Sequence, residues 1–139
     1  MALVQRLQTR PQFQAALAGA IVAKTTHFAL HRKALDAASA RQSLSGTVEV
    51  TVLFPVRDVW LGAMVPKRWA KRAVTRNTIK RQIYTVSADF LHRYPQAALV
   101  VRLRRDFSRT EFVSATSVRL KAAVRTEVCA LFEAGARAP

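Results

Sequence analysis

The segment KRAVTRNTIKRQ, residues 71–82, gathers positively charged side chains around one asparagine. Its arginines carry planar guanidinium forks that match phosphate oxygens, its lysines carry mobile point charges, and the asparagine adds a neutral donor and acceptor. No aspartate or glutamate occurs between Asp58 and Asp89. Because like charges on a short segment repel one another, this pattern predicts a surface that binds phosphate groups of a polyanion.

A helix would bring these side chains together. No glycine or proline interrupts residues 70–92, and Pro95 bars a longer helix. Residues at helical spacing form one apolar stripe: Thr75, Ile79, Ile83, Val86 and Phe90. The sequence therefore predicts a long amphipathic helix whose basic side chains lie beside this stripe, and positive backbone charge at the helix start favours the same anion. The candidate phosphate-binding residues of this helix and of the turn before it are Lys67, Arg68, Lys71, Arg72, Arg76, Asn77, Lys80 and Arg81.

An ordinary solvated helix face is the alternative, because most charge runs in proteins are solvated faces. Such faces, however, usually alternate glutamate with lysine at a spacing of four residues, where the two charges support each other. This helix has no acid before Asp89, near its end. The binding interpretation is therefore favoured.

Composition supports a polyanionic partner. The 139 residues carry 23 Lys and Arg against 8 Asp and Glu, a formal net charge of +15, while 50% of the residues are hydrophobic. This predicts one globular domain over residues 1–139 that binds nucleic acid or an anionic membrane surface. No apolar run reaches the roughly 18 residues of a membrane span, and no signal peptide is evident. Cys129 is the single cysteine, which suits a reducing compartment, and we expect a cytoplasmic protein.

Hydrophobic patterning predicts the order α-β-β-β-α-β-α, an α+β sandwich in which a small mixed sheet packs against the long basic helix and flanking helices. Thr9 and Pro11 are typical of a helix start, and Gly19 of its end. Residues 34–46 are expected to form a flexible loop or an insertion. A last helix should run from Val113 to Gly135. Segments with the pattern of strands are 25–32, 47–54, 60–65 and 97–103.

The motif KRAVTRNTIKR resembles the signature of the bacterial ribonuclease P protein subunit, in which an Arg-Asn pair precedes Lys-Arg by three residues on one long helix. The strand and turn WLGAMVPKR before it are also similar to that family. The resemblance implies a catalytic RNA that removes the 5′ leader of precursor tRNA, with the protein as its RNA- and leader-binding partner. It further implies Mg²⁺ held mainly by the RNA, no organic cofactor, no membrane association and no obligate protein partner. Family members commonly carry Arg-Glu where this chain has Tyr84-Thr85.

The resemblance also implies a cleft for the leader strand between the first helix and the sheet. Aromatic and basic side chains are the expected lining, because aromatic rings stack on unpaired bases and cations bind phosphates. The residues carried over to this cleft are Phe13, Lys24, Phe28, His31 and Arg32. Core packing remains the alternative for Phe13 and is favoured for Phe28. The trio Arg102, Arg104 and Arg105 either extends the RNA-binding surface or is solvated.

The sequence contains no evident catalytic or metal centre. Its 8 acids are scattered, and its histidines have no cysteine or acid at the spacing of metal ligands. Two other functions remain open at this point. A ribosomal protein would carry a similar charge without a catalytic assembly, and a DNA-binding regulator could use the long helix as a reader.

Overall fold

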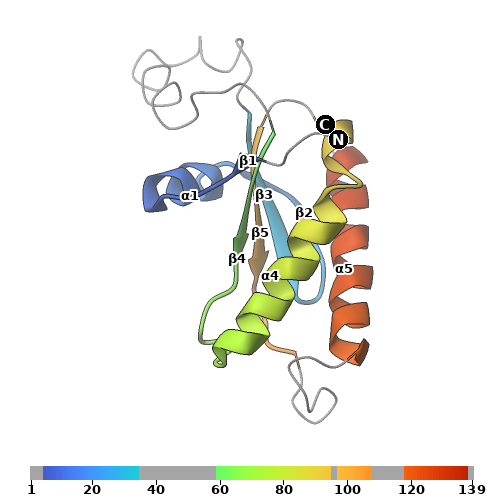
Figure 1. Cartoon of the computed structure of the whole chain (residues 1–139). Helices are drawn as coiled ribbons and strands as arrows, with labels where there is room; N and C mark the ends of the chain where they lie inside the picture. The colour runs from blue at the N-terminus through green and yellow to red at the C-terminus, as the bar shows by residue number, and fades with distance from the viewer. Residues whose placement is uncertain (1–4, 35–58, 95–96, 108–117, 138–139) are drawn as a thin grey trace.

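The computed structural model describes residues 5–34, 59–94, 97–107 and 118–137. Within these ranges it has one five-stranded sheet and three α-helices (Figure 1). Their order is β1 (Gln5–Arg6), α1 (Arg10–Leu17), β2 (Ala20–Lys24), β3 (Phe28–Ala34), β4 (Trp60–Met64), α4 (Ala73–Ser87), the 3₁₀ turn η1 (Leu91–Arg93), β5 (Ala97–Leu103) and α5 (Val118–Arg137). The α+β class expected from the sequence, with a mixed sheet against a long basic helix, is confirmed.

The sheet has the strand order β1-β4-β5-β3-β2. The central strand β5 pairs in parallel with β4 and antiparallel with β3. Every residue of β5 except Arg102 is buried, as expected for a strand with continuous apolar composition that is covered on both faces. The strands predicted at 60–65 and 97–103 are therefore confirmed.

The other strand predictions differ in part from the structure. The strand expected at 25–32 begins only at Phe28, because Glu127 of α5 accepts hydrogen bonds from the Thr25 hydroxyl and the His27 amide, each 2.7 Å long, and holds a turn there. The edge strands β1 and β2 were not predicted. Both are short, and β2 (AIVAK) lacks the alternation by which a half-buried strand is recognised. The loop expected at 34–46 and the strand expected at 47–54 fall outside the described residues, apart from Ala34 at the end of β3.

Helix α1 starts as the sequence predicts. Thr9 is the N-cap, its hydroxyl accepts a hydrogen bond from the Gln12 amide, and the Gln12 side chain accepts one from the Thr9 amide. This reciprocal pairing satisfies two amides that a helix start leaves without partners. The helix ends at Leu17, and Gly19 follows it into β2 with a negative φ.

Helix α4 is shorter than the pattern indicates. It begins at Ala73 rather than Ala70 and ends at Ser87 rather than His92. Beyond Ser87 the backbone amides bond to carbonyls three residues back, as in Phe90 to Ser87 and Arg93 to Phe90, so the chain tightens into turns that end in η1. The apolar stripe holds at its centre, where Ile79, Ile83 and Val86 are buried.

Helix α5 does not end at Gly135, contrary to the sequence prediction; it continues to Arg137. Gly135 lies inside the helix because neighbouring groups leave no room for a side chain. A Cβ there would lie 2.5 Å from Leu30 Cδ2 and 2.6 Å from the Tyr94 hydroxyl oxygen. That hydroxyl donates to the carbonyl of Phe132 at 2.7 Å, and burial raises the pKa of Tyr94 to about 12.

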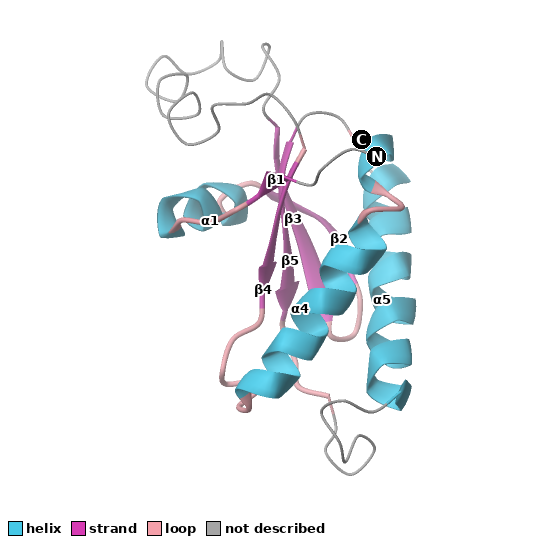
Figure 2. Ribbon diagram, in the orientation of Figure 1, coloured by secondary structure: helices cyan, strands magenta, loops and turns pink. Residues whose placement is uncertain are grey.

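The helices divide between the two faces of the sheet, as Figure 2 shows. Helices α4 and α5 cover one face, where the larger core cluster includes Phe28, Leu30 and Leu99. Helix α1 covers part of the other face, where a smaller cluster includes Leu7, Ala16 and Val100. Because side chains alternate along a strand, neighbouring residues of β3 face different helices. No helix in the described part of the chain has the length and hydropathy needed to cross a membrane.

Candidate nucleic-acid interface

Residues 66–72, here called the basic turn, connect β4 to α4 and carry four exposed cationic side chains: Lys67, Arg68, Lys71 and Arg72. The turn is ordered by its own backbone, because the amides of Trp69 and Ala70 both donate to the carbonyl of Pro66 at 3.1 Å. Trp69 is half-buried, with the Arg68 guanidinium 5.1 Å from its ring centroid. The turn thus holds four cations outward on a fixed backbone.

Arg76 has a structural role that its position in the motif does not indicate. Its Nη1 donates to the carbonyls of Ala70 at 3.0 Å and Lys71 at 2.8 Å. The guanidinium therefore closes the basic turn against the first turn of α4. The sequence assigned Arg76 to phosphate contact alone. Because its guanidinium also bonds to the turn, we expect that replacing Arg76 would disturb the turn as well.

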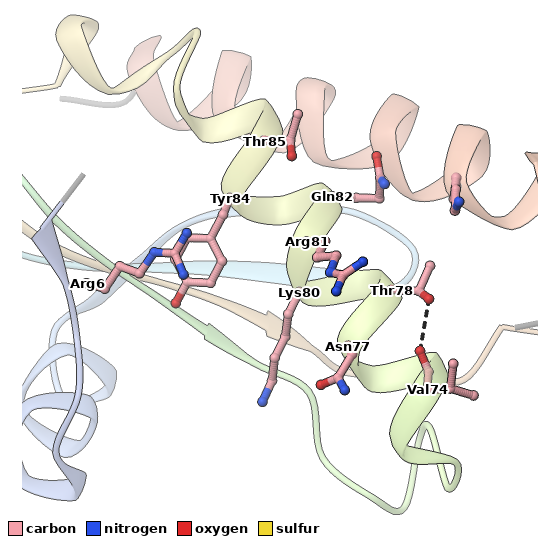
Figure 3. Close-up of a pocket in the computed structure, with 10 residues that line it drawn as sticks. Arg6, Val74, Asn77, Thr78, Lys80, Arg81, Gln82, Tyr84 and Thr85 are labelled. Atoms are coloured by element: carbon pink, nitrogen blue, oxygen red, sulfur yellow. Dashed lines mark hydrogen bonds between the residues drawn. The ribbon is translucent and has the colours of Figure 1, made fainter. Parts of the chain in front are cut away.

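The outward side of α4 presents Asn77, Lys80 and Arg81, here called the α4 basic face. This face borders an open hollow of about 830 Å³. Figure 3 shows Arg6 of β1 beside Tyr84 at one side of it and Gln82 turned toward α5 at the other. None of the residues that line the hollow is acidic: Arg6, Val74, Asn77, Thr78, Lys80, Arg81, Gln82, Tyr84, Thr85 and Lys121. The hollow can therefore accept the phosphate backbone of a nucleic acid without repulsion from a carboxylate among its lining residues.

Arg6 and Lys121 belong to this surface although sequence reasoning missed both. Arg6 lies in a two-residue edge strand, and Lys121 lies on α5. They are separated from α4 by tens of residues in sequence, and no local pattern connects them to the motif. Only the packing of β1 against β4 and of α5 against α4 brings them beside Lys80 and Arg81.

Three of the residues predicted to line a leader cleft lie together on the other face of the sheet: Phe13, Lys24 and His31. Phe13 of α1 lies over β4, since a Cβ on Gly62 would lie 2.5 Å from Phe13 Cε1. His31 lies on this same face, because it pairs with Val100, a residue of the α1-side cluster. Lys24, which pairs with Ala29, shares the face and is exposed.

Two residues assigned to the cleft lie on the wrong side of the sheet. Phe28 is fully buried in the larger cluster under α4 and α5. Arg32 pairs with Leu99, also a residue of that cluster, so its side chain leaves the sheet on the same side as Phe28. The cleft assignments of Phe28 and Arg32 are therefore wrong, because the two-residue period of a strand separates them from His31.

Arg102, whose role the sequence left undecided, lies beside His31. It lies in β5 rather than in a solvated loop, and its Nε donates to His31 Nε2 at 3.2 Å. His31 is only 6% exposed. Arg104, by contrast, is committed to the backbone, donating from Nε and Nη2 to the carbonyl of Thr25.

Burial lowers the pKa of His31 from its ordinary value of 6.5, and the positive charges of Arg102 and Lys24 act in the same direction, outweighing a hydrogen bond to the Leu17 backbone that raises it. The unfolded chain therefore binds this proton more readily than the folded protein, and the stability that neutral His31 contributes is lost as pH falls below 6.5. We expect thermal unfolding between about pH 7 and about pH 5 to show a steeper loss of stability in the unaltered protein than in His31→Gln. Exposed His92→Gln is the control, and an unchanged pH slope in His31→Gln would contradict this expectation.

Nothing in the described residues provides a metal centre, since no group of three or more His, Cys, Asp or Glu side chains comes together there. Among the acids that the structure describes, Glu127 accepts a hydrogen bond from His27 Nδ1 at 2.7 Å, and the His27 ring stacks on Phe107 with a centroid distance of 4.0 Å. These contacts fix the start of β3 to α5. What the described surface presents is cationic and aromatic side chains in two places, the α4 basic face with its turn and the α1 face of the sheet.

Comparison with known proteins points to one family. The sequence profile of the family described as Ribonuclease P matches residues 1–126. A ribonuclease P protein component from Nostoc sp. (strain PCC 7120 / SAG 25.82 / UTEX 2576) is 36% identical over 94 residues, and one from Trichormus variabilis (strain ATCC 29413 / PCC 7937) is 35% identical over 94 residues. Each match spans 63% of this chain and 64% of the relative, so the chain spans slightly less than two thirds of the curated relatives' length.

Two solved structures share the fold. The Staphylococcus aureus RNase P protein superimposes with a TM-score of 0.61 at 15% identity, covering 94% of both chains. A mutant of that protein, described as defective in mRNA degradation activity, superimposes with a TM-score of 0.60 at 16% identity, covering 92% of this chain and 85% of the mutant. At such low identity the likeness concerns the fold.

Proposed function

The chain belongs to the ribonuclease P protein family, and from this premise we propose that it acts as the protein subunit of a ribonuclease P. In this role it binds a catalytic RNA and the 5′ leader of precursor tRNA. The catalytic RNA hydrolyses the phosphodiester bond that joins the leader to the tRNA. The match to this family disfavours the ribosomal protein and the DNA-binding regulator.

The observation that carries this proposal is the uncompensated positive surface formed by α4 and the basic turn. Lys67, Arg68, Lys71, Arg72 and Arg81 are exposed, and the hollow beside them has no acidic lining. Binding an RNA there releases condensed counterions from its phosphates, so affinity is gained without sequence-specific contacts. This is the behaviour expected of a protein that recognises the shape and backbone of a structured RNA.

The α1 face of the sheet is the proposed site for the leader strand. Phe13 offers a half-buried ring, while Lys24 and Arg102 offer cations to the strand's phosphates. Such a combination of ring and cations holds a single strand with little demand on its sequence. The RNA and the leader would then lie on different faces of one small domain, which positions the precursor relative to the catalytic RNA.

The protein's contribution to catalysis is electrostatic in this proposal. The 8 acids of the chain are scattered along the sequence, and we assign the Mg²⁺ ions of the reaction mainly to the RNA, with no organic cofactor. With a net charge of +15, the protein lowers the repulsion between catalytic RNA and precursor tRNA. We further propose that it works in the cytoplasm, without a membrane or an obligate protein partner.

A reconstituted cleavage assay tests this function. Precursor tRNA is incubated with the protein, with ribonuclease P RNA from the same organism, or with both, across a series of Mg²⁺ concentrations. We expect no cleavage by the protein alone and cleavage by the mixture at Mg²⁺ concentrations too low for the RNA alone, because protein cations replace part of the metal's screening. Activity of the protein alone that survives nuclease treatment, or no stimulation at any Mg²⁺ concentration, would overturn the proposal.

Replacing Phe13 by alanine tests the leader site. Loss of one stacked base costs about 1–3 kcal/mol, so the assembled protein–RNA complex should bind precursor tRNA roughly 5- to 150-fold more weakly. Mature tRNA lacks a leader and should bind as before. Because Phe13 is only half-buried, its removal should also destabilise the fold by less than the 3–5 kcal/mol typical of a core phenylalanine. Equal weakening for precursor and mature tRNA would contradict the assignment.

A further inference from the structure

The side chain of Arg6 is placed on an aromatic ring at the border of the α4 basic face. Its guanidinium carbon lies 4.1 Å from the centroid of the Tyr84 ring, within the range of a cation–π contact. Arg6 itself is exposed. In Figure 3 its guanidinium lies across the Tyr84 ring, on the side of α4 from which Lys80 also projects. Two cations from different elements therefore border one hollow.

Tyr84 is held in place, so the arginine that rests on it is held as well. The Tyr84 hydroxyl oxygen accepts a hydrogen bond from the Ala63 amide of β4 at 3.3 Å, and the ring packs at the edge of the larger core cluster. Burial raises the pKa of Tyr84, so the ring stays neutral. The backbone of Arg6 is fixed too, since β1 pairs in parallel with β4.

This arrangement differs from an ordinary surface arginine. A free arginine side chain samples many rotamers and loses that freedom when it binds a ligand. Here the stack on Tyr84 restricts the rotamers beforehand, while the edges of a stacked guanidinium remain available to donate to oxygens. No acid lines the hollow to pair with Arg6. Among the described residues that border the hollow, Arg6 therefore meets no carboxylate, and its guanidinium edges are suited to bind an external anion.

We propose that Arg6, oriented by the ring of Tyr84, binds a backbone phosphate of the RNA that lies on the α4 basic face. This inference rests on the proposed function and adds a residue from the edge strand to the RNA site. Tyr84 is a positioning residue in it, and Arg6 makes the contact. The uncharged Tyr84 side chain thereby holds the Arg6 cation beside α4.

The salt dependence of RNA binding separates the two roles. We would measure dissociation constants for ribonuclease P RNA, transcribed in vitro from the source genome, across a salt series. For Arg6→Ala, losing one phosphate contact should flatten the log–log slope by about 0.7–0.9 and weaken binding about fivefold near 0.15 M salt. For Tyr84→Leu the charge stays and only its placement is lost, so the slope should remain while affinity falls about two- to fivefold.

Two conservative variants complete the test. Tyr84→Phe keeps the ring and should bind like the unaltered protein, although it loses the hydrogen bond from Ala63. Arg6→Lys keeps the charge without the planar stack, so its slope should be retained and its affinity should lie between those of Arg6→Ala and the unaltered protein. Arg137→Ala, an exposed arginine at the far end of α5, is the control for a change in net charge. Thermal melting of each variant shows whether it is folded.

The possible outcomes distinguish this inference from the proposed function. If the unaltered protein does not bind the RNA, the proposed function itself fails. If it binds, and Lys80→Ala weakens binding while folded Arg6→Ala matches Arg137→Ala in slope and affinity, Arg6 makes no phosphate contact and the inference is overturned. If Arg6→Ala flattens the salt-dependence slope as expected but Tyr84→Leu binds like the unaltered protein, Arg6 contacts a phosphate and the positioning role of Tyr84 is refuted.

Discussion

Replacing Arg72, Lys80 and Arg81 together by alanine should weaken binding to ribonuclease P RNA about hundredfold at 0.15 M salt. Each phosphate contact contributes about 0.7–0.9 to the slope of log affinity against log salt, so three lost contacts should flatten it by about 2–3. The fold should persist, because Arg72 and Arg81 are exposed, Lys80 is half-buried, and such substitutions mostly change stability within about 0.5 kcal/mol.

The choice of residues follows from the structure. Arg76 belongs to the same motif but is left out, because its two hydrogen bonds to the carbonyls of Ala70 and Lys71 would confuse a loss of binding with a disturbed turn. The matched control replaces three exposed arginines outside the α4 basic face and the basic turn, Arg10, Arg93 and Arg137, and removes the same charge. Equal loss of affinity in both triple variants would mean that net charge alone, and not this face, binds the RNA.

Gly19→Ala should be the most damaging single glycine substitution among the described residues. A Cβ at Gly19 would lie 2.2 Å from the carbonyl oxygen of Arg32 and 2.8 Å from its carbonyl carbon. Both atoms belong to the backbone of β3, which is paired on both sides and has little freedom to move. We expect a loss of about 3 kcal/mol of stability, at the upper end for overpacking. Thermal unfolding should show a melting temperature lower by about 10 °C.

Gly62→Ala is the matched comparison for this effect. Its Cβ would meet the ends of two side chains, Phe13 Cε1 at 2.5 Å and Leu7 Cδ1 at 2.8 Å. Phe13 is half-buried and can rotate toward solvent, so the loss should be nearer 1 kcal/mol. Gly62→Ala should also disturb the leader site, because the ring that must move is Phe13. Equal losses of stability for the two glycine variants would contradict the distinction between backbone and side-chain obstacles.

Much of the site was readable from sequence because its signal is local. The helix that carries the basic residues follows from the spacing of Ile79, Ile83 and Val86, all of which are buried. The start of α1 follows from Thr9 and Pro11, and the central strand β5 from its continuous apolar run. The family follows from the KRAVTRNTIKR motif on this helix, and the match over residues 1–126 confirms it.

Alternation along β3 also contained information that the cleft assignment did not use. A strand places Phe28 and His31 on opposite faces, so a cleft that includes His31 excludes Phe28. The structure confirms this separation, with Phe28 under the helices and His31 beside Arg102. Which face each residue occupies, however, depends on where α1, α4 and α5 pack, and that is not visible in β3 alone.

The sequence by itself therefore determined the helix, its charge and the family, because these depend on residues a few positions apart. Only the tertiary structure decided which distant groups share a surface with them. Arg6 reaches Tyr84 because β1 pairs with β4 across more than fifty residues of chain, and Arg102 reaches His31 because β5 pairs with β3. Arg76 turns back to the carbonyl of Lys71, and Gly135 continues its helix because Leu30 and Tyr94 fill the space beside it. Such contacts depend on packing between elements, for which a single chain read residue by residue carries no local pattern.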